Sequence, residues 1–275
     1  MDAEEEFVAQ LSDDRLKYFA LILATFCCYM FGYLYISPTL SRRFYKGYDN
    51  LSDLQKRDWN TRGFSTVNSV ITSSLCVYIL LFDEKANLEH IWARSTLSSI
   101  NISLLTGYIL CDLAIVLTYF PLIESLSYSS HHLAAVCAYI YSLTYNGLLY
   151  FANFRVLAEI STPFVNFRWI MSTIGVKKSH KLFIINGLMM VAVFFSVRIL
   201  TMPYYYYKMI SVWRSPIVDT LSLHMKICWM SASIVLDSIN LLWFRKMFNG
   251  ARKILKENSK TQIEDSNIRK REKGK

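Results

Sequence analysis

Long stretches of mostly apolar residues recur along this chain, separated by short polar segments. A helix needs about 20 mainly apolar residues to cross the hydrocarbon core of a bilayer. Seven stretches approach or reach that length, and we expect them to form membrane spans at residues 17–36, 64–82, 98–120, 131–146, 147–170, 182–202 and 221–244. The fourth and fifth are ambiguous, because they also fit one long helix followed by a half-buried segment. The pattern predicts an all-α polytopic bundle of membrane helices.

The composition excludes other fold classes. Hydrophobic residues make up 53% of the 275 residues and charged residues 19%, whereas a soluble domain carries about 25% charged residues. Such a chain is too apolar for a disordered or collagen-like protein. All six cysteines lie inside the apolar stretches, without the spacing of metal ligands, so we expect reduced, buried thiols and no metal site.

The net charge of +9 is concentrated near the ends of the chain. Residues 1–16 form an acidic segment with six Asp and Glu against one Arg, and residues 245–275 hold eleven Lys and Arg against four acidic residues. A basic segment next to a membrane helix meets anionic lipid more readily than nucleic acid. We therefore expect a basic cytosolic tail at 246–275, beginning with an amphipathic helix on the membrane surface over 245–256, and no nucleic-acid partner.

The distribution of Lys and Arg predicts the orientation in the membrane. Residues 37–63 hold six and residues 171–181 hold three, while the other segments before the tail hold two or none. Because cytosolic loops are enriched in Lys and Arg, this arrangement favours seven spans with a lumenal N-terminus and a cytosolic C-terminus. The first span, 17–36, lacks a following cleavage site and reads as a retained anchor. The glycosylation sequon at Asn50 is then cytosolic and stays unmodified.

Polar and ionisable residues recur at helical spacing inside the predicted spans. Such groups cost a few kcal/mol in a bilayer and usually face the protein interior. On one reading they are structural, with Arg155 and Arg198 neutralising Glu159, Asp112 or Asp237. On the other they line a cavity that holds a lipid or fatty-acyl headgroup. The residues that we expect to line such a cavity are Asn68, Tyr108, Arg155, Asn166, Arg198, Asp237 and Asn240.

The adjacent pair His131-His132 is the sharpest chemical feature of the sequence. Neighbouring side chains on a helix project about 100° apart, so at most one points directly into a given site. Ser129 or Ser130 is a candidate N-cap, which would place both rings in the first turn, where the helix dipole favours a neutral base or nucleophile. Asp112 and Glu159 are the candidate carboxylates that would orient it. The alternative is a polar anchor at the membrane interface.

Four short motifs, taken in order, resemble the TLC domain, which ceramide synthases share with the translocating-chain-associated membrane protein and smaller lipid-linked proteins. The resemblance covers about residues 50–245. The motifs are Trp59-Asn60-Thr61-Arg62 with Ser65-Thr66, Gly107-Tyr108 with Asp112, His131-His132, and Glu159-Ile160-Ser161-Thr162-Pro163 with Asn166 and Arg168-Trp169.

The resemblance implies a protein of the endoplasmic reticulum or a related endomembrane. It also implies six helices around a central lipid-facing cavity, preceded by one extra helix. In ceramide synthases the paired histidines belong to the N-acyltransferase site, which implies that role for His131 and His132. The paired aspartates that follow in those enzymes have no counterpart here, because Glu159 is the sole acid of its motif. Some members carry a His where this chain has Asn68.

Two hypotheses follow, and whether the protein is an enzyme stays open between them. The first is a role in membrane lipid homeostasis, in which the intramembrane cavity binds or senses a lipid or fatty-acyl group and no cofactor is needed. The second is an N-acyltransferase that takes its acyl group from acyl-CoA and uses the His131-His132 pair. The sequence predicts no particular protein partner for either.

Overall fold

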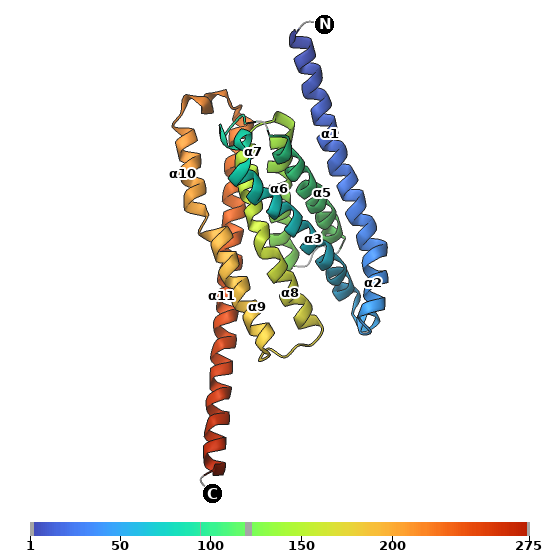
Figure 1. Cartoon of the computed structure of the whole chain (residues 1–275), viewed down its shortest axis with the longest axis vertical. Helices are drawn as coiled ribbons and strands as arrows, with labels where there is room; N and C mark the ends of the chain where they lie inside the picture. Colours follow the sequence, from blue (N-terminus) through green and yellow to red (C-terminus); the bar gives the residue numbers. More distant parts are fainter. Residues whose placement is uncertain (1–2, 94, 119–122, 274–275) are drawn as a thin grey trace.

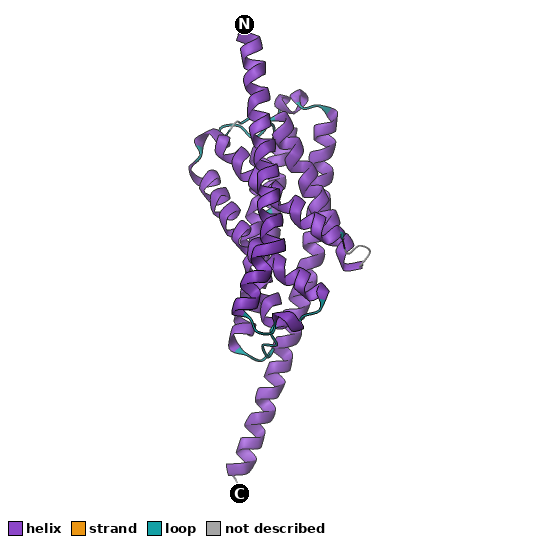
Figure 2. Cartoon of the chain, turned by 90° about the vertical axis from the view of Figure 1, so that its right-hand side faces the viewer, coloured by secondary structure: helices purple, strands orange, loops and turns teal. Residues whose placement is uncertain are grey.

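The computed structural model describes residues 3–93, 95–118 and 123–273, with side-chain environments described for 14–93, 95–118 and 126–256. Every regular element in these ranges is helical, as Figure 2 shows, so the predicted all-α class is confirmed. The elements are α1 (Ala3–Phe31), the π-helical turn η1 (Gly32–Ile36), α2 (Ser37–Phe44), the 3₁₀ turn η2 (Tyr48–Asn50), α3 (Asp53–Phe82), α4 (Glu84–Asn87), α5 (Thr96–Leu117), α6 (Ile123–Tyr145), α7 (Leu149–Val156), the 3₁₀ turn η3 (Leu157–Ser161), α8 (Thr162–Thr173), α9 (Lys181–Phe194), the π-helical turn η4 (Phe195–Ile199), α10 (Met202–Trp213), the 3₁₀ turn η5 (Pro216–Thr220) and α11 (Leu223–Lys273).

The long helices run along the molecule's long axis, and α1 begins at the end opposite to that where α11 finishes (Figure 1). Within the described residues, five helical segments are long and apolar enough to cross a membrane, which confirms a multi-pass membrane protein. They are Asp14–Phe44, Asp53–Phe82, Thr96–Leu117, Lys181–Trp213 and Leu223–Lys256. We call the end that holds α2, the α8–α9 connection and the outgoing part of α11 the basic end, after the Lys and Arg of these segments.

The predicted fourth and fifth spans fall on α6 and on the α7–η3–α8 segment, which are not among those five. They do not form one long helix, because the chain turns between them at positive φ, 49° at Asn146 and 61° at Leu148. Gly147 lies between these two residues in a close approach to Trp92 and Met225. Both segments lie within the bundle and carry the polar side chains described below, which lowers their hydropathy (Figure 1).

The first helix packs on the bundle. A Cβ at Gly107 of α5 would lie 2.5 Å from the backbone oxygen of Ile22 in α1, so only glycine permits this approach. Tyr29 of α1 donates a hydrogen bond to Asn68 Oδ1 on α3 (3.2 Å), and its ring lies 5.1 Å from that of Tyr108. The predicted anchor is therefore an integral part of the fold.

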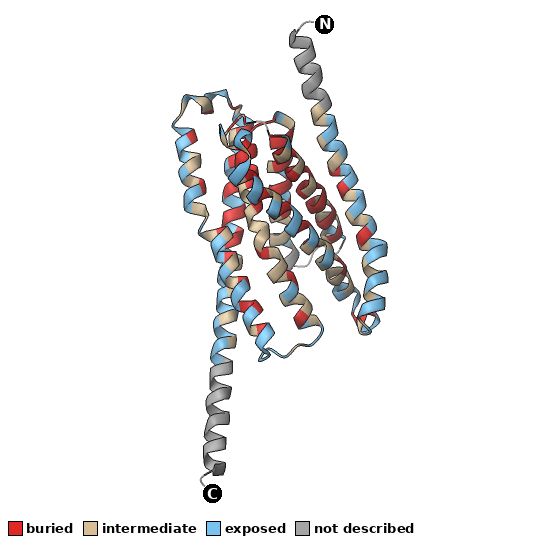
Figure 3. Ribbon diagram, in the orientation of Figure 1, coloured by how far each residue is buried: buried red, intermediate tan, exposed pale blue. Residues whose placement is uncertain are grey.

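Buried residues concentrate on the inward faces of α3, α5, α6, α7 and α11 (Figure 3). Many of the exposed residues have large apolar side chains. All six cysteines are free, but the expectation of burial holds only for Cys76 and Cys111, since Cys228 is half-buried and Cys27, Cys28 and Cys137 are exposed. These three thiols face outward from apolar helices, where a membrane protein presents small apolar groups to lipid.

The predicted surface helix over 245–256 is wrong, because these residues continue α11 without a break and extend along the long axis (Figure 1). Gly250 does not interrupt the helix, and a single glycine is tolerated inside a long helix at a modest cost. Most of the predicted acidic segment 1–16, and the part of the basic tail 246–275 beyond residue 256, lie outside the residues whose side chains are described.

Candidate functional site

A cavity of about 380 Å³ lies inside the bundle toward the basic end. Ligand pockets for small molecules typically measure about 300–1,000 Å³. Side chains from α3, α5, α6, α8, α9, α11 and the two turns η3 and η4 wall it: Arg62, Ser65, Tyr108, Ile109, Tyr128, His131, His132, Glu159, Thr162, Val165, Asn166, Phe194, Arg198, Trp243, Lys246 and Met247. Polar groups from distant parts of the sequence therefore converge on one space within the membrane bundle.

His132 forms one unit with Asp112 and Tyr128. Its Nε2 lies 3.1 Å from Asp112 Oδ2, and its Nδ1 lies 2.9 Å from the backbone oxygen of Tyr128. The Tyr128 hydroxyl donates to the same Asp112 oxygen at 2.7 Å. Both ring nitrogens thus face acceptors, so Nδ1 carries a proton and a second proton must lie between Nε2 and the carboxyl. Wherever that second proton rests, the Asp112–His132 pair has no net charge.

His131 has a different environment on the same helix. Its ring lies 4.9 Å from the Trp243 ring of α11 and 6.0 Å from the His132 ring, and it borders the cavity. Its Nδ1 is buried without a hydrogen-bond partner in the described part of the chain. The prediction that Ser129 or Ser130 caps the helix is wrong, because α6 already begins at Ile123 and both serines are interior. The histidines therefore lie beyond the first turn, where the dipole argument fails.

Arg198 reaches the cavity from the π-helical turn η4. Its Nε donates to Ser161 Oγ (3.1 Å) and its Nη1 to Asn240 Oδ1 (3.0 Å). Its Nη2 lies 3.9 Å from Glu159 Oε1, too far for a hydrogen bond, while Glu159 Oε2 accepts one from Thr162 (2.9 Å). π-Helical turns inside α-helices occur frequently at functional sites. Here the turn helps place a buried guanidinium beside an incompletely bonded carboxylate.

Arg155 and Asp237 lie next to this cavity, on its side away from the basic end of the bundle. Arg155 Nη2 donates to Asp237 Oδ2 at 2.9 Å, Nη1 donates to Oδ1, and the guanidinium lies 3.8 Å from the centre of the Tyr205 ring. A second cavity, of about 40 Å³, borders Arg155, Glu159, Arg198 and Asn240 and shares His131 with the first. It is large enough for waters but not for an acyl chain.

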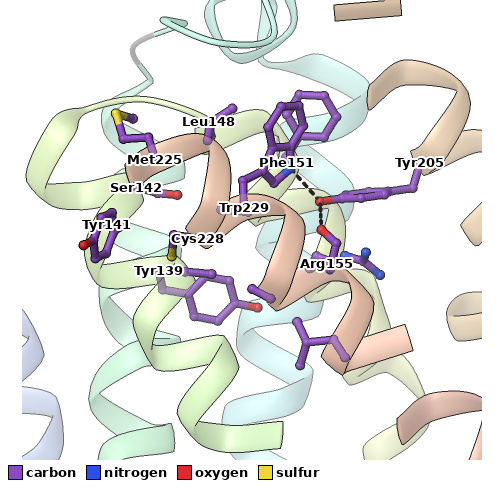
Figure 4. A pocket seen from close by; sticks show the side chains of 15 residues that line it. Tyr139, Tyr141, Ser142, Leu148, Phe151, Arg155, Tyr205, Met225, Cys228 and Trp229 are labelled. Carbon is purple, nitrogen blue, oxygen red and sulfur yellow. Dashed lines mark hydrogen bonds between the residues drawn. The ribbon is translucent and has the colours of Figure 1, made fainter. Parts of the chain in front are cut away.

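A third cavity, of about 30 Å³, continues from Arg155 toward the opposite end of the bundle (Figure 4). Its lining is mainly apolar, and it shares Tyr139 with the second cavity. Tyr205 points inward, where its hydroxyl accepts a hydrogen bond from Trp229 Nε1 and lies 2.9 Å from Ser233 Oγ (Figure 4). The three cavities thus change from polar to apolar along the bundle.

Arg62, Lys246, Tyr128 and Trp243 are cavity residues that the sequence analysis missed. Arg62 Nη1 donates to Asn166 Oδ1 (3.0 Å), and its guanidinium lies 5.1 Å from the centre of the Trp169 ring. Arg62 precedes the predicted span 64–82, but α3 begins eleven residues earlier, at Asp53, with a capping box between Ser52 and Gln55. The motif Trp59-Asn60-Thr61-Arg62 is the sequence signal that could have identified Arg62 as a site residue.

The structure separates the predicted site residues into four groups. Tyr108, His131, His132, Glu159, Asn166 and Arg198 border the large cavity, whereas Arg155 and Asn240 border the second. Asp112 and Asp237 lie behind the walls as partners of His132 and Arg155. Asn68 borders none of the three cavities and belongs to the α1–α3 contact. Within the described residues, no three His, Cys, Asp or Glu side chains are grouped closely enough to hold a metal.

Comparison with known proteins identifies the family. The model of the TLC domain matches residues 58–249. TLC domain-containing protein 4-B of Danio rerio is 35% identical, with 90% of this chain and 93% of that protein covered. TLC domain-containing protein 4 of Homo sapiens is 32% identical over 89% and 94%. Topoisomerase I damage affected protein 4 of Saccharomyces cerevisiae is 28% identical over 86% and 85%. No solved structure matches. This multi-pass membrane protein therefore belongs to the TLC domain family.

Proposed function

We propose that this protein acts in membrane lipid homeostasis by holding a lipid or fatty-acyl headgroup in the 380 Å³ cavity. The observation that carries the proposal is the placement of charged and hydrogen-bonding groups around a space of ligand size inside a membrane bundle. Arg62, Arg198 and Glu159 border that space, and such groups are costly in a bilayer unless they have a role. A lipid headgroup supplies polar atoms to these side chains while its tails stay in apolar surroundings.

The proposal includes the endoplasmic reticulum or a related endomembrane, with a lumenal N-terminus and a cytosolic C-terminus. The Lys and Arg of residues 42–46, 56–62 and 177–181 share one end of the bundle with the outgoing part of α11. By the positive-inside rule this basic end is cytosolic. The cavity is then accessible from the cytosolic half of the membrane.

Obstructing the cavity tests the binding role. Val165 borders the cavity, so Val165→Trp fills part of it, whereas Val70 is 51% exposed on the outer face of α3 and Val70→Trp serves as a matched control. The wild type and both variants are purified in detergent, and the lipid retained per protein is quantified by mass spectrometry. We expect Val165→Trp to lose lipid that Val70→Trp keeps. Equal retention in all three would place the lipid outside the cavity and contradict the proposal.

An N-acyltransferase is the second candidate, favoured by the unpartnered Nδ1 of His131 at the cavity and the adjacent Asp112–His132 unit. In this scheme the imidazole nitrogen takes the acyl group from the thioester of acyl-CoA. Coenzyme A leaves as the thiol with the ring's other proton. An amine then takes the acyl group and gives up one N–H proton, which restores the neutral imidazole.

The two candidates differ in whether the acyl chain becomes covalently bound. The intact mass of the protein after exposure to acyl-CoA is compared between wild type, His131→Ala and His132→Ala. An adduct of acyl mass that disappears in a histidine variant supports the transferase. Lipid that is extracted reversibly, without an adduct and unchanged in both variants, supports the binding role alone.

A further inference from the structure

The charges around the large cavity do not cancel. Among the described side chains, three permanent cations border it, namely Arg62 from α3, Arg198 from η4 and Lys246 from α11, and Glu159 is the one acidic lining residue. The Asp112–His132 pair contributes no net charge, since acceptors at both ring nitrogens require two protons on the pair, and Asp112 itself lies behind the wall. Arg155 and Asp237 neutralise each other next to the cavity. With His131 neutral, the lining therefore carries two uncompensated positive charges.

The individual contacts of these cations agree with that count. Glu159 is 3.9 Å from Arg198 and shares its carboxylate with Thr162, so it only partly offsets this guanidinium. Arg62 and Lys246 have no ion pair within the described side chains, and Arg62 Nε is buried without a hydrogen-bond partner. A buried donor without a partner is costly, and so is a charge partly removed from water without a full counter-charge. These costs apply to the half-buried Arg62 and the buried Arg198, whereas Lys246 is exposed and only adds positive charge to the lining. An anion in the cavity would supply an acceptor for Arg62 Nε and a counter-charge for the lining cations.

We propose that the ligand of the cavity is a lipid with an anionic, phosphate-bearing headgroup. This inference rests on the proposed function and names its ligand class. A phosphate offers three or four acceptor oxygens around one atom, which suits cations that converge from different helices, and arginine binds such oxygens in pairs. A negatively charged headgroup offsets both excess positive charges. A zwitterionic headgroup, by contrast, brings its own cation into a site that already has an excess of positive charge.

The test compares two lipids that differ in net headgroup charge. Purified wild type in detergent is equilibrated with equal amounts of dioleoyl phosphatidic acid and dioleoyl phosphatidylcholine, and both lipids are quantified by mass spectrometry after washing. One hydrogen bond to a charged group corresponds to about tenfold in binding, so we expect at least about tenfold enrichment of phosphatidic acid. Lys246→Gln and Arg62→Gln should each reduce the enrichment, and Lys246 is exposed enough that its substitution leaves the fold intact.

The control is Lys178→Gln, which removes an exposed cation at the same end of the bundle but outside the cavity lining, and which should leave the enrichment unchanged. Equal retention of the two lipids, abolished by Val165→Trp, overturns the anionic assignment and leaves lipid binding intact. Enrichment that Val165→Trp does not affect overturns the assignment to the cavity. No lipid retained at all overturns both proposals.

Two further arms separate the sources of phosphate. Inorganic phosphate that displaces phosphatidic acid from the wild type at millimolar concentration would assign the cations to the free ion and overturn the lipid assignment. Palmitoyl-CoA retained in preference to phosphatidic acid would indicate that the cations bind the phosphates of the coenzyme. That result would also overturn the phospholipid assignment. Failure of both competitors to displace phosphatidic acid, together with the charge variants, supports the phospholipid.

Discussion

Arg155 and Asp237 bind each other at two points across α7 and α11, although they are 82 residues apart in the sequence. Both side chains are almost enclosed, at 14% and 7% exposure. A buried ion pair of this kind fixes which helices are neighbours more than it adds stability, because desolvation offsets much of its Coulomb attraction. Its loss is nevertheless expensive when only one partner is removed.

Removing one partner of this pair therefore has a different result from removing both. We expect Asp237→Leu to destabilise the protein by about 3–5 kcal/mol, because it leaves the Arg155 charge buried and unpaired. The double variant Arg155→Met with Asp237→Leu should recover most of that loss. Thermal unfolding in detergent measures both, and a double variant no more stable than Asp237→Leu would contradict this account.

The proton shared by Asp112 and His132 is visible by nuclear magnetic resonance. In Asp112→Asn the amide nitrogen can donate to His132 Nε2, so we expect a neutral ring with its proton on Nδ1, facing the Tyr128 oxygen. In the wild type, the ¹⁵N spectrum should show either two ring N–H groups or one N–H on Nδ1, and in the second case the ¹³C shift of the Asp112 carboxyl should be that of a protonated acid. A neutral wild-type ring protonated on Nε2 alone would refute the hydrogen-bond assignment.

The contact between α1 and α5 depends on the absence of a side chain at Gly107. Gly107→Ala places a Cβ against the backbone of Ile22, and we expect it to destabilise the protein by about 1–3 kcal/mol through overpacking. Gly63→Ala is the matched control, since a Cβ there meets no atom within 4 Å. It should be neutral or stabilise α3 by about 0.5–1 kcal/mol. Unfolding temperatures of the two variants check the contrast.

The orientation has a simple test at Asn50, which ends η2 at the basic end of the bundle. If this end is cytosolic, Asn50 meets no glycosyltransferase and glycosidase treatment leaves the electrophoretic mobility of the microsomal protein unchanged. An extension with a sequon, added before Met1, should by contrast be modified. Glycan on Asn50 would reverse the proposed orientation.

At the end of the bundle opposite to the basic end, His90 makes the stability of the fold depend on pH. It lies in the α4–α5 connection, outside the membrane spans, and partial burial and the nearby Lys208 lower its pKa below 6.5. The folded state then binds fewer protons than the unfolded state, so the stability contributed by neutral His90 is complete above pH 6.5 and declines as the pH falls through the window below it. We expect a small drop in unfolding temperature on acidification that His90→Phe lessens. An equal drop in both proteins would contradict this assignment.

The helices of this fold could be predicted from the sequence because length and apolarity decide a membrane span. The positions of the helix ends were harder to predict. Arg62 was counted as a loop charge because hydropathy detects the part of α3 inside the bilayer and not its polar extension from Asp53. Likewise, Ser129 resembles an N-cap locally, but the chain before it is already helical.

Partner choice in the polar interior could be predicted only as a set of candidates. Asp112 and Glu159 were both candidates to orient a histidine, and the sequence contains no information on the packing of α5 against α6 that selects Asp112. The same holds for Arg155, whose partner is Asp237 and not Glu159, four residues along its own segment. These assignments depend on helix rotation, which hydrophobic periodicity defines only approximately in spans buried on several sides.

The steep decrease in cavity size along the bundle, from about 380 Å³ to about 40 and 30 Å³, has a consequence for selectivity. In the described residues, neither of the two cavities that continue from the first along the bundle is wide enough for a hydrocarbon chain, so we expect the tails to pass between helices into the surrounding bilayer. The bundle would then distinguish lipids by what they carry at the polar end and be indifferent to the number of methylenes. Lipids that share a headgroup and differ only in chain length should compete as equals.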